Sequence, residues 1–233
     1  MHRLTLTVAA AVLATGCSHG AKTVKPCAEA RADAAKHVVH GALRGDVDGD
    51  GRSDIVSLVR LRGNARCGAV LIVRTRSGTL SHAFRTVSFP GVPSLNGLAA
   101  LSDPQPGLKI VITTWQGAST AFARVFAVRR SRISEIPIDT PEGTIPYEGS
   151  VTHFNAVDCG APGSIVASGW AEVGASGRRF SFERRFYRVG ELRFELARVQ
   201  SGRTRSPLPE RGRFPEFREP QPFPSCMRVR AAP

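Results

Sequence analysis

Residues 45–56 read Gly-Asp-Val-Asp-Gly-Asp-Gly-Arg-Ser-Asp-Ile-Val, and this stretch decides how the rest of the chain is interpreted. Carboxylates occupy the alternate positions 46, 48 and 50 and return at 54, while Gly51 stands where the backbone must turn. A hard cation such as Ca2+ takes six to eight oxygen ligands, which a tight loop of alternating acids supplies within a short length of chain. The pattern predicts a calcium site with side-chain ligands Asp46, Asp48, Asp50 and Asp54, and with the carbonyl of Arg52 as a backbone ligand.

The loop departs from the EF-hand pattern. An EF-hand needs a bidentate Glu at loop position 12, and counting from Asp46 that position is Ser57. Residues 55–59 are rich in β-branched side chains and predict a strand, whereas a helix follows an EF-hand loop. An acidic turn that merely solvates a hairpin is the other alternative. Closely spaced carboxylates without a counter-ion repel one another, which argues against that alternative.

The chain contains a repeat of 55 residues, since Ile-Val pairs begin at positions 55, 110 and 165. Trp115 and Trp170 share one repeat position, where the first copy has Arg60. A Gly-containing loop and a predicted hairpin follow each Ile-Val pair, so each copy has four short strands, the content of one propeller blade. The hairpins are predicted at 69–74 with 79–87, at 121–128 with 132–138, and at 180–188 with 192–196.

Only the first copy keeps the full set of acids. The middle acid persists as Asp103 and Asp158, and one carboxylate alone is too few for a Ca2+ site. We therefore expect one calcium ion with a structural role, fixing the turn between the first two strands of the first copy. The positions of Asp46, Asp50 and Asp54 hold Leu101, Gln105 and Lys109 in the second copy and Ala156, Gly160 and Ser164 in the third.

A strand, a loop with Asp-Gly-Asp-Gly at 48–51 and a second apolar strand together resemble the FG-GAP (VCBS) repeat of integrin-like β-propellers. The resemblance implies an all-β fold of three repeated, four-stranded, blade-like sheets. Closed propellers typically have four to eight blades. Three copies either pack around a small threefold core, which we expect, or form an open arc closed by oligomerisation or by the C-terminal tail. The expected bounds of the domain are 37–200, with copies at 37–91, 92–146 and 147–200.

The N-terminus predicts an exported lipoprotein. Residues 1–3 are a short positive segment, and the apolar run at 4–13 is too short to span a bilayer. Small residues before Cys17 resemble the bacterial lipobox, in which the cysteine is lipidated and becomes the first mature residue. An ordinary secretory signal that contains a cysteine is the alternative. We expect a signal peptide at 1–16, a tether with a short helix at 17–36, and attachment to the extracytoplasmic face of the bacterial membrane.

Four cysteines remain beyond Cys17, and an even number outside the cytoplasm predicts two disulfides with three possible pairings. In a blade of the resembled family, the calcium loop and the loop after the second strand lie at opposite ends. That arrangement favours the pairs Cys27–Cys67 and Cys159–Cys226.

Residues 201–233 are rich in Pro and Arg, a composition that disfavours regular helix and central strand. They predict an extended tail on the surface, with disorder as the alternative. The tail would be anchored by Cys226, with Phe214, Phe217 and Phe223 in surface grooves.

The net charge is +13, most of it from arginine, which raises the question of a nucleic-acid partner. The arginines are scattered, no nucleic-acid motif occurs, and the export signal places the chain outside the cell. We therefore expect no nucleic-acid partner. Lipid headgroups and acidic cell-wall polymers are the expected anionic neighbours.

The sequence contains no nucleophile elbow, phosphate loop, zinc signature or dinucleotide fingerprint, so it offers no catalytic residue. In proteins with FG-GAP repeats, ligands commonly meet the face opposite the calcium loops. That face implies the candidate binding residues Arg60, Arg62, Trp115 and Trp170.

Two tryptophans at one repeat position can stack on sugar rings, and the arginines can bind acidic groups. Burial between the sheets is the alternative and the usual place for a large aromatic side chain. We expect a calcium-stabilised, lipid-anchored module that binds a glycan, a cell-wall polymer or a protein. An extracytoplasmic hydrolase with a site on one face is the alternative function.

Overall fold

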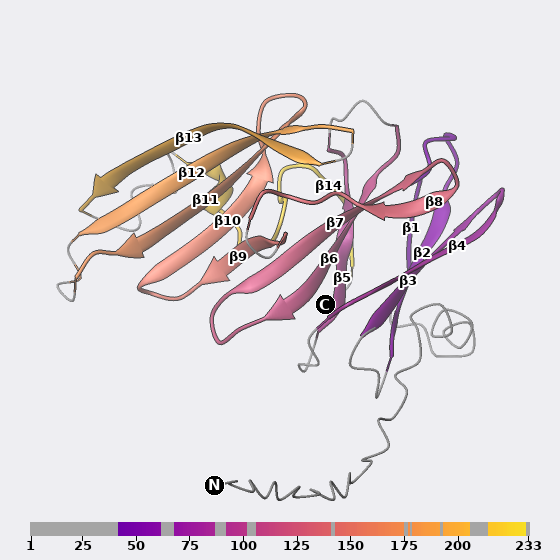
Figure 1. Ribbon diagram of the computed structural model, residues 1–233, viewed down its shortest axis with the longest axis horizontal. Coiled ribbons are helices and arrows are strands. Elements are labelled where there is room, and N and C mark those ends of the chain that lie inside the picture. Colours follow the sequence, from indigo (N-terminus) through magenta and orange to yellow (C-terminus); the bar gives the residue numbers. More distant parts are fainter. Residues whose placement is uncertain are drawn as a thin grey trace, which may run out of the picture.

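A computed structural model shows an all-β protein of antiparallel strands, which confirms the predicted fold class (Figure 1). The strands form a four-stranded sheet and a ten-stranded sheet. The structure describes residues 42–61, 68–86, 92–101, 106–140, 143–174, 177, 179–191, 193–205 and 214–231.

The four-stranded sheet is a simple meander with strand order β1-β2-β3-β4. Its second strand contains the first Ile-Val pair and follows directly on the acidic loop. The hairpin predicted at 69–74 with 79–87 corresponds to β3 and β4. The strands are β1 (Ala42–Gly45), β2 (Asp54–Arg60), β3 (Ala69–Thr75) and β4 (Gly78–Phe84).

The larger sheet has the order β13-β12-β11-β10-β9-β7-β6-β5-β14, and β8 pairs with β7 beside this path. The other two predicted hairpins correspond to β7 with β8 and to β12 with β13. The strands are β5 (Ser94–Ala99), β6 (Lys109–Gln116), β7 (Ala121–Arg129), β8 (Arg132–Glu135), β9 (Ile145–Gly149), β10 (His153–Cys159), β11 (Ser164–Glu172), β12 (Phe180–Val189), β13 (Phe194–Thr204) and β14 (Met227–Arg230).

The described strands form two sheets where three separate blades were expected, and these strands do not close into a ring. The three copies do contribute four consecutive strands each, β1–β4, β5–β8 and β10–β13, but β9 joins the last two groups into one sheet. The reason lies along the edge of β7. The short β8 covers only Phe126 to Arg129, so the backbone of Ala121 to Ala123 is free to pair with β9. Backbone groups in a folded core must find partners, and β9 supplies them.

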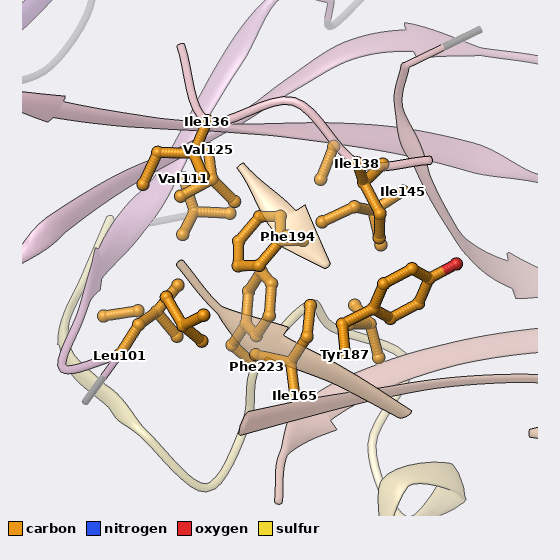
Figure 2. Packing of buried hydrophobic residues seen from close by; sticks show 14 of the residues in the cluster. Leu101, Val111, Val125, Ile136, Ile138, Ile145, Ile165, Tyr187, Phe194 and Phe223 are labelled. Atoms are coloured by element: carbon orange, nitrogen blue, oxygen red, sulfur yellow. The ribbon is translucent and has the colours of Figure 1, made fainter. Parts of the chain in front are cut away.

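The strand β6 lies in the middle of the molecule and is buried on both faces along most of its length. Ile110 and Ile112 of β6 pack in a cluster with Leu58 and Leu71 of the four-stranded sheet. The intervening Val111 belongs to a second cluster, shared with β10–β13 and the C-terminal segment. Figure 2 shows Phe194, Phe223 and Tyr187 in that second cluster. A strand buried on both faces has a continuous apolar sequence, as the Ile-Val-Ile run of β6 does.

The C-terminal segment lies on the protein as expected but contains more regular structure than predicted. Phe214, Phe217 and Phe223 are buried, and the expected disulfide between Cys159 and Cys226 is present. The segment also forms a 3-10 helix, Pro215–Phe217, and the edge strand β14, which pairs with β5. A strand is possible there because β14 contains no proline. The strand β13 ends at Thr204, beyond the expected domain boundary at 200.

A buried ion pair anchors this segment to the face of the ten-stranded sheet. Glu216 is completely buried and accepts hydrogen bonds from Nε and Nη2 of Arg184 at 2.7 and 3.1 Å. The hydroxyl of Ser168 donates a third hydrogen bond, at 2.5 Å. The guanidinium of Arg184 also lies 4.2 Å from the centre of the Phe214 ring, a cation–π contact. Charge, hydrogen bonds and aromatic packing therefore hold the segment at one place.

Several expectations lie outside the described residues. They are the signal peptide at 1–16, the tether and short helix at 17–36, the lipidated Cys17, the pair Cys27–Cys67 and the candidate binding residue Arg62. In the part of the chain that the structure describes, no helix has both the length and the apolar character needed to cross a bilayer.

Candidate functional site

The acidic loop between β1 and β2 brings three of its carboxylates together. Oxygens of Asp46, Asp48 and Asp50 all lie within 4.8 Å of one another. Backbone N–H groups of the loop hold these side chains: Gly49 and Gly51 donate to the two oxygens of Asp46 at 2.7 and 2.9 Å. Both glycines have a positive φ, 84° and 82°, which a residue with a Cβ rarely adopts. The glycines therefore allow the backbone to wrap around the acids.

The electrostatics of this group favour a cation. Two unit charges 4.8 Å apart repel by about 3.5 kcal/mol at an effective dielectric constant of 20, and the group contains three such pairs. A divalent ion at the centre would replace this repulsion with attraction to every carboxylate. Carboxylate oxygens are the ligands that Ca2+ and Mg2+ prefer. The donor set therefore fits a hard divalent cation.

The other two predicted ligands are Asp54 and the backbone carbonyl of Arg52. Asp54 is outside the group of three and almost fully buried, and its Oδ2 accepts hydrogen bonds from the N–H groups of Val47 and Asp48 at 3.0 and 3.3 Å. Burial raises the pKa of Asp54, while the Val47 hydrogen bond acts in the opposite direction. The N–H of Arg52, whose carbonyl was the predicted backbone ligand, donates to Oδ1 of Asp50 at 2.8 Å. Asp54 therefore holds the start of the loop by accepting hydrogen bonds from its backbone, and it does not join the three carboxylates.

The acidic loop packs against the corresponding segment of the second copy. The N–H of Leu108 donates to the carbonyl of Asp46 at 2.7 Å. A Cβ on Gly49 would come within 2.6 Å of Pro106, and one on Gly107 within 2.6 Å of the Val47 carbonyl. The two glycines therefore permit backbone contact between the copies, so the position of the acidic loop is coupled to the packing of the two sheets.

In the second and third expected copies, the residues at the positions of the loop acids make different contacts. Lys109, at the position of Asp54, is buried, and its ammonium donates to the carbonyl of Gly107 at 2.7 Å. Asp158 lies inside β10, and its Oδ1 accepts from both the N–H and the hydroxyl of Ser225, at 2.9 and 2.7 Å. The acid that the third copy retains therefore binds the C-terminal segment, a role that the repeat pattern did not predict.

The acidic loop also borders a hollow of about 240 Å3. Asp48 and Asp50 line one side, and the β7–β8 turn provides Arg130 and Ser131 on another. Neither turn residue was a sequence candidate, because both lie about 80 positions away in the chain and no motif marks them.

The predicted binding residues do not form one surface. Trp115 lies on β6 with its ring 4.4 Å from that of Phe122, and it is partly exposed. Trp170 lies on β11, and the strands β7, β9 and β10 stand between β6 and β11 in the sheet. The guanidinium of Arg60 donates to the carbonyl of Pro93 at 2.9 Å. The three described candidates therefore occupy separate places.

Two adjoining hollows lie over β10–β13, and of the sequence candidates for binding only Trp170 is among the described residues that line them. The wider one, about 590 Å3, extends over the outer part of these strands, and the smaller, about 180 Å3, lies nearer the core beside Tyr187. Asn155, Gly169 and Glu183 stand opposite one another on β10, β11 and β12 and line both hollows. The alternation of β12 does place Glu183, Arg185 and Tyr187 on one face, and this was the available signal.

The carboxylates of this region do not resemble a hydrolase pair. Glu148 of β9 stands opposite Asn155, so three strand spacings, about 14 Å along the sheet, separate it from Glu183. Inverting glycosidases place their two carboxyl groups about 6.5–9.5 Å apart, and retaining enzymes place them closer. Burial raises the pKa of Glu148, but no second acid lies opposite it at catalytic spacing on this row.

Comparisons of the chain with protein-family models, with curated proteins and with solved structures gave no match. The arguments for function therefore rest on the sequence and on the geometry described above.

Proposed function

We propose that the protein is a calcium-stabilised, lipid-anchored binding module at the extracytoplasmic face of a bacterial membrane, which binds a glycan, a cell-wall polymer or a protein partner. The observation that carries this proposal is the group of Asp46, Asp48 and Asp50, whose oxygens lie within 4.8 Å of one another in a loop braced by its own N–H groups. Calcium is the proposed ion because an Asp-rich loop of this kind presents hard oxygen ligands.

The proposed role of the ion is structural. The acidic loop packs on residues 106–108 of the second copy, so an ion that fixes the loop also fixes the contact between the two sheets. This role agrees with the resemblance of residues 45–56 to the FG-GAP repeat. We further propose that the three four-stranded groups descend from one repeated blade-like unit, because their Ile-Val pairs fall at the same place in β2, β6 and β11.

A binding role is supported by the open hollows over β10–β13. The wider hollow has the size of a typical ligand site, and its lining combines polar residues with the aromatic residues Trp170 and Phe182. The proposed membrane attachment rests on Cys17 and on the apolar segment before it.

Pull-down of cell-envelope fractions by the purified protein, with calcium and with a chelator, tests the proposal. We expect retention of a polysaccharide or protein component, weaker binding after chelation, and recovery when calcium is restored. An Asp46→Asn, Asp48→Asn variant should behave as the chelated protein does, and Glu219→Gln, an exposed change in the C-terminal segment, is the matched control. The proposal fails if no envelope fraction is retained under any of these conditions.

A further inference from the structure

The smaller hollow has the dimensions of a site for one ring-sized group. It measures about 180 Å3, well above the roughly 10–15 Å3 that a single water needs on this measure. Its walls come from the segment Ile138–Thr140, from Pro146 of β9 and from the middle of β10, β11 and β12. It adjoins the wider hollow along Asn155, Gly169 and Glu183, so a chain-like ligand can continue from one into the other.

A buried hydroxyl without an acceptor forms part of this hollow. Tyr187 is 1% exposed, and its ring packs in the apolar cluster with Phe194. Figure 2 shows its hydroxyl pointing away from the apolar side chains. Arg185 is the side chain that interacts with this hydroxyl, and a guanidinium can donate hydrogen bonds but not accept them. Among the described residues the proton of the hydroxyl therefore has no acceptor.

An unsatisfied buried hydroxyl is unusual enough to need an explanation. Leaving such a group without a partner destabilises the folded protein. Burial raises the pKa of Tyr187, so the group is a protonated donor at neutral pH. The exposed surface of the hydroxyl is below 1 Å2, so a ligand oxygen in the hollow accepts this proton once a neighbouring side chain moves aside.

The other side chains that line the smaller hollow include both hydrogen-bond donors and acceptors. Glu183 accepts a hydrogen bond from Nε of Arg185 at 2.6 Å. The amide oxygen of Asn155 lies 3.0 Å from the place where a Cβ on Gly169 would stand, so the missing side chain makes room for the amide. An amide both donates and accepts, a carboxylate accepts, and the Tyr187 hydroxyl donates.

We infer that this hollow binds one sugar unit of an uncharged glycan. Each sugar hydroxyl donates and accepts at once, which matches walls that offer both. Glu183 and Arg185 form an ion pair, so these two side chains bring no net charge to the wall, and a neutral hydroxyl can bond to both. The inference rests on the proposed binding function and adds the chemistry of the ligand and the residues that bind it.

Saturation-transfer NMR of the full chain tests the inference. The probes are methyl glucopyranoside, methyl galactopyranoside and methyl mannopyranoside, with galacturonate and glucosamine as charged comparators. The variant Tyr187→Phe removes only the hydroxyl in the hollow. The matched control is Tyr147→Phe, since the two tyrosines share the apolar cluster but the Tyr147 hydroxyl bonds to Thr113.

We expect at least one neutral sugar to bind more tightly than both charged probes. Tyr187→Phe should weaken that binding by about tenfold, an effect of 1.4 kcal/mol, and leave Tm unchanged or higher because it removes an unsatisfied group. Tyr147→Phe should lower Tm and leave the Kd unchanged.

Three results would overturn the inference: no neutral probe binds, a charged probe binds more tightly, or Tyr187→Phe changes the Kd by less than twofold. The proposed function is judged separately by the envelope pull-down. If envelope material is retained equally by Tyr187→Phe and is not displaced by neutral sugars, the sugar site is wrong and the binding module stands.

Discussion

Replacing Glu216 by Gln should destabilise the protein by about 3 kcal/mol. Removing one member of a buried ion pair costs about 3–5 kcal/mol, because the other charge remains buried without a partner. Here Arg184 is 13% exposed and also contacts the Phe214 ring, and a glutamine can still accept the hydrogen bond from Ser168. These three features place the cost at the lower end of the range. In a protein of this size about 3 kcal/mol corresponds to a fall in Tm of about 6–12 °C.

Denaturant unfolding of the oxidised protein, followed by circular dichroism, measures this change. The control is Glu219→Gln, since Glu219 pairs with Arg230 at 3.2 Å but both side chains are about half exposed, 51% and 43%. An exposed pair contributes about 0–1 kcal/mol, so the control should differ little from the parent protein. In the double variant Glu216→Met, Arg184→Met, part of the stability should return.

The argument would be wrong if Glu216→Gln and Glu219→Gln lost the same small amount of stability. That result would mean that Phe214, Phe217 and the disulfide hold the C-terminal segment without help from the ion pair. A double variant less stable than either single variant would also contradict it.

Three further outcomes follow from the structure. Calcium should raise Tm by several degrees, and Asp46→Asn should abolish this increase; a Tm indifferent to calcium and chelator would exclude the site. The variant Cys159→Ala, Cys226→Ala should lose about 4 kcal/mol of unfolding free energy, because the disulfide closes a loop with a separation of 67 residues. A loss below about 1 kcal/mol would contradict this expectation. Burial raises the pKa of Glu148, so the folded protein favours the protonated carboxyl. The contribution of this group to stability is therefore complete below the unfolded-state pKa and is lost as pH rises through the folded-state pKa. Glu148→Gln should therefore raise Tm near neutral pH but not near pH 4, and an equal change at both would refute it.

Much of the strand pattern could be predicted from the sequence. The Ile-Val pairs and the alternating apolar residues located β2, β6 and β11 and the hairpins that follow them, because a strand beside a core must alternate or be continuously apolar. The Cys159–Cys226 pair was also predicted correctly. The strands depend on local patterns, which a sequence displays directly, whereas the cysteine pairing came from the resemblance to a repeat family.

The joining of two four-stranded groups into one sheet could not be predicted, because it depends on how far the short β8 extends along β7. The role of Asp158 was also hidden, since its partner Ser225 lies 67 positions away in a segment that the repeat does not include. The hollow beside Tyr187 combines residues from 138 to 187, and none of them forms a motif. Long-range placement, rather than local propensity, decides all three.

Lys109 places a buried cation of the chain itself 55 positions after Asp54, a carboxylate of the acidic loop. At the position where the first copy has Asp54, the second copy buries an ammonium that binds the loop carbonyl of Gly107. A positive charge that is part of the chain cannot be diluted away or removed by a chelator. Calcium depletion should consequently disturb the loop at 46–54 and leave the hydrogen bond between Lys109 and Gly107 intact.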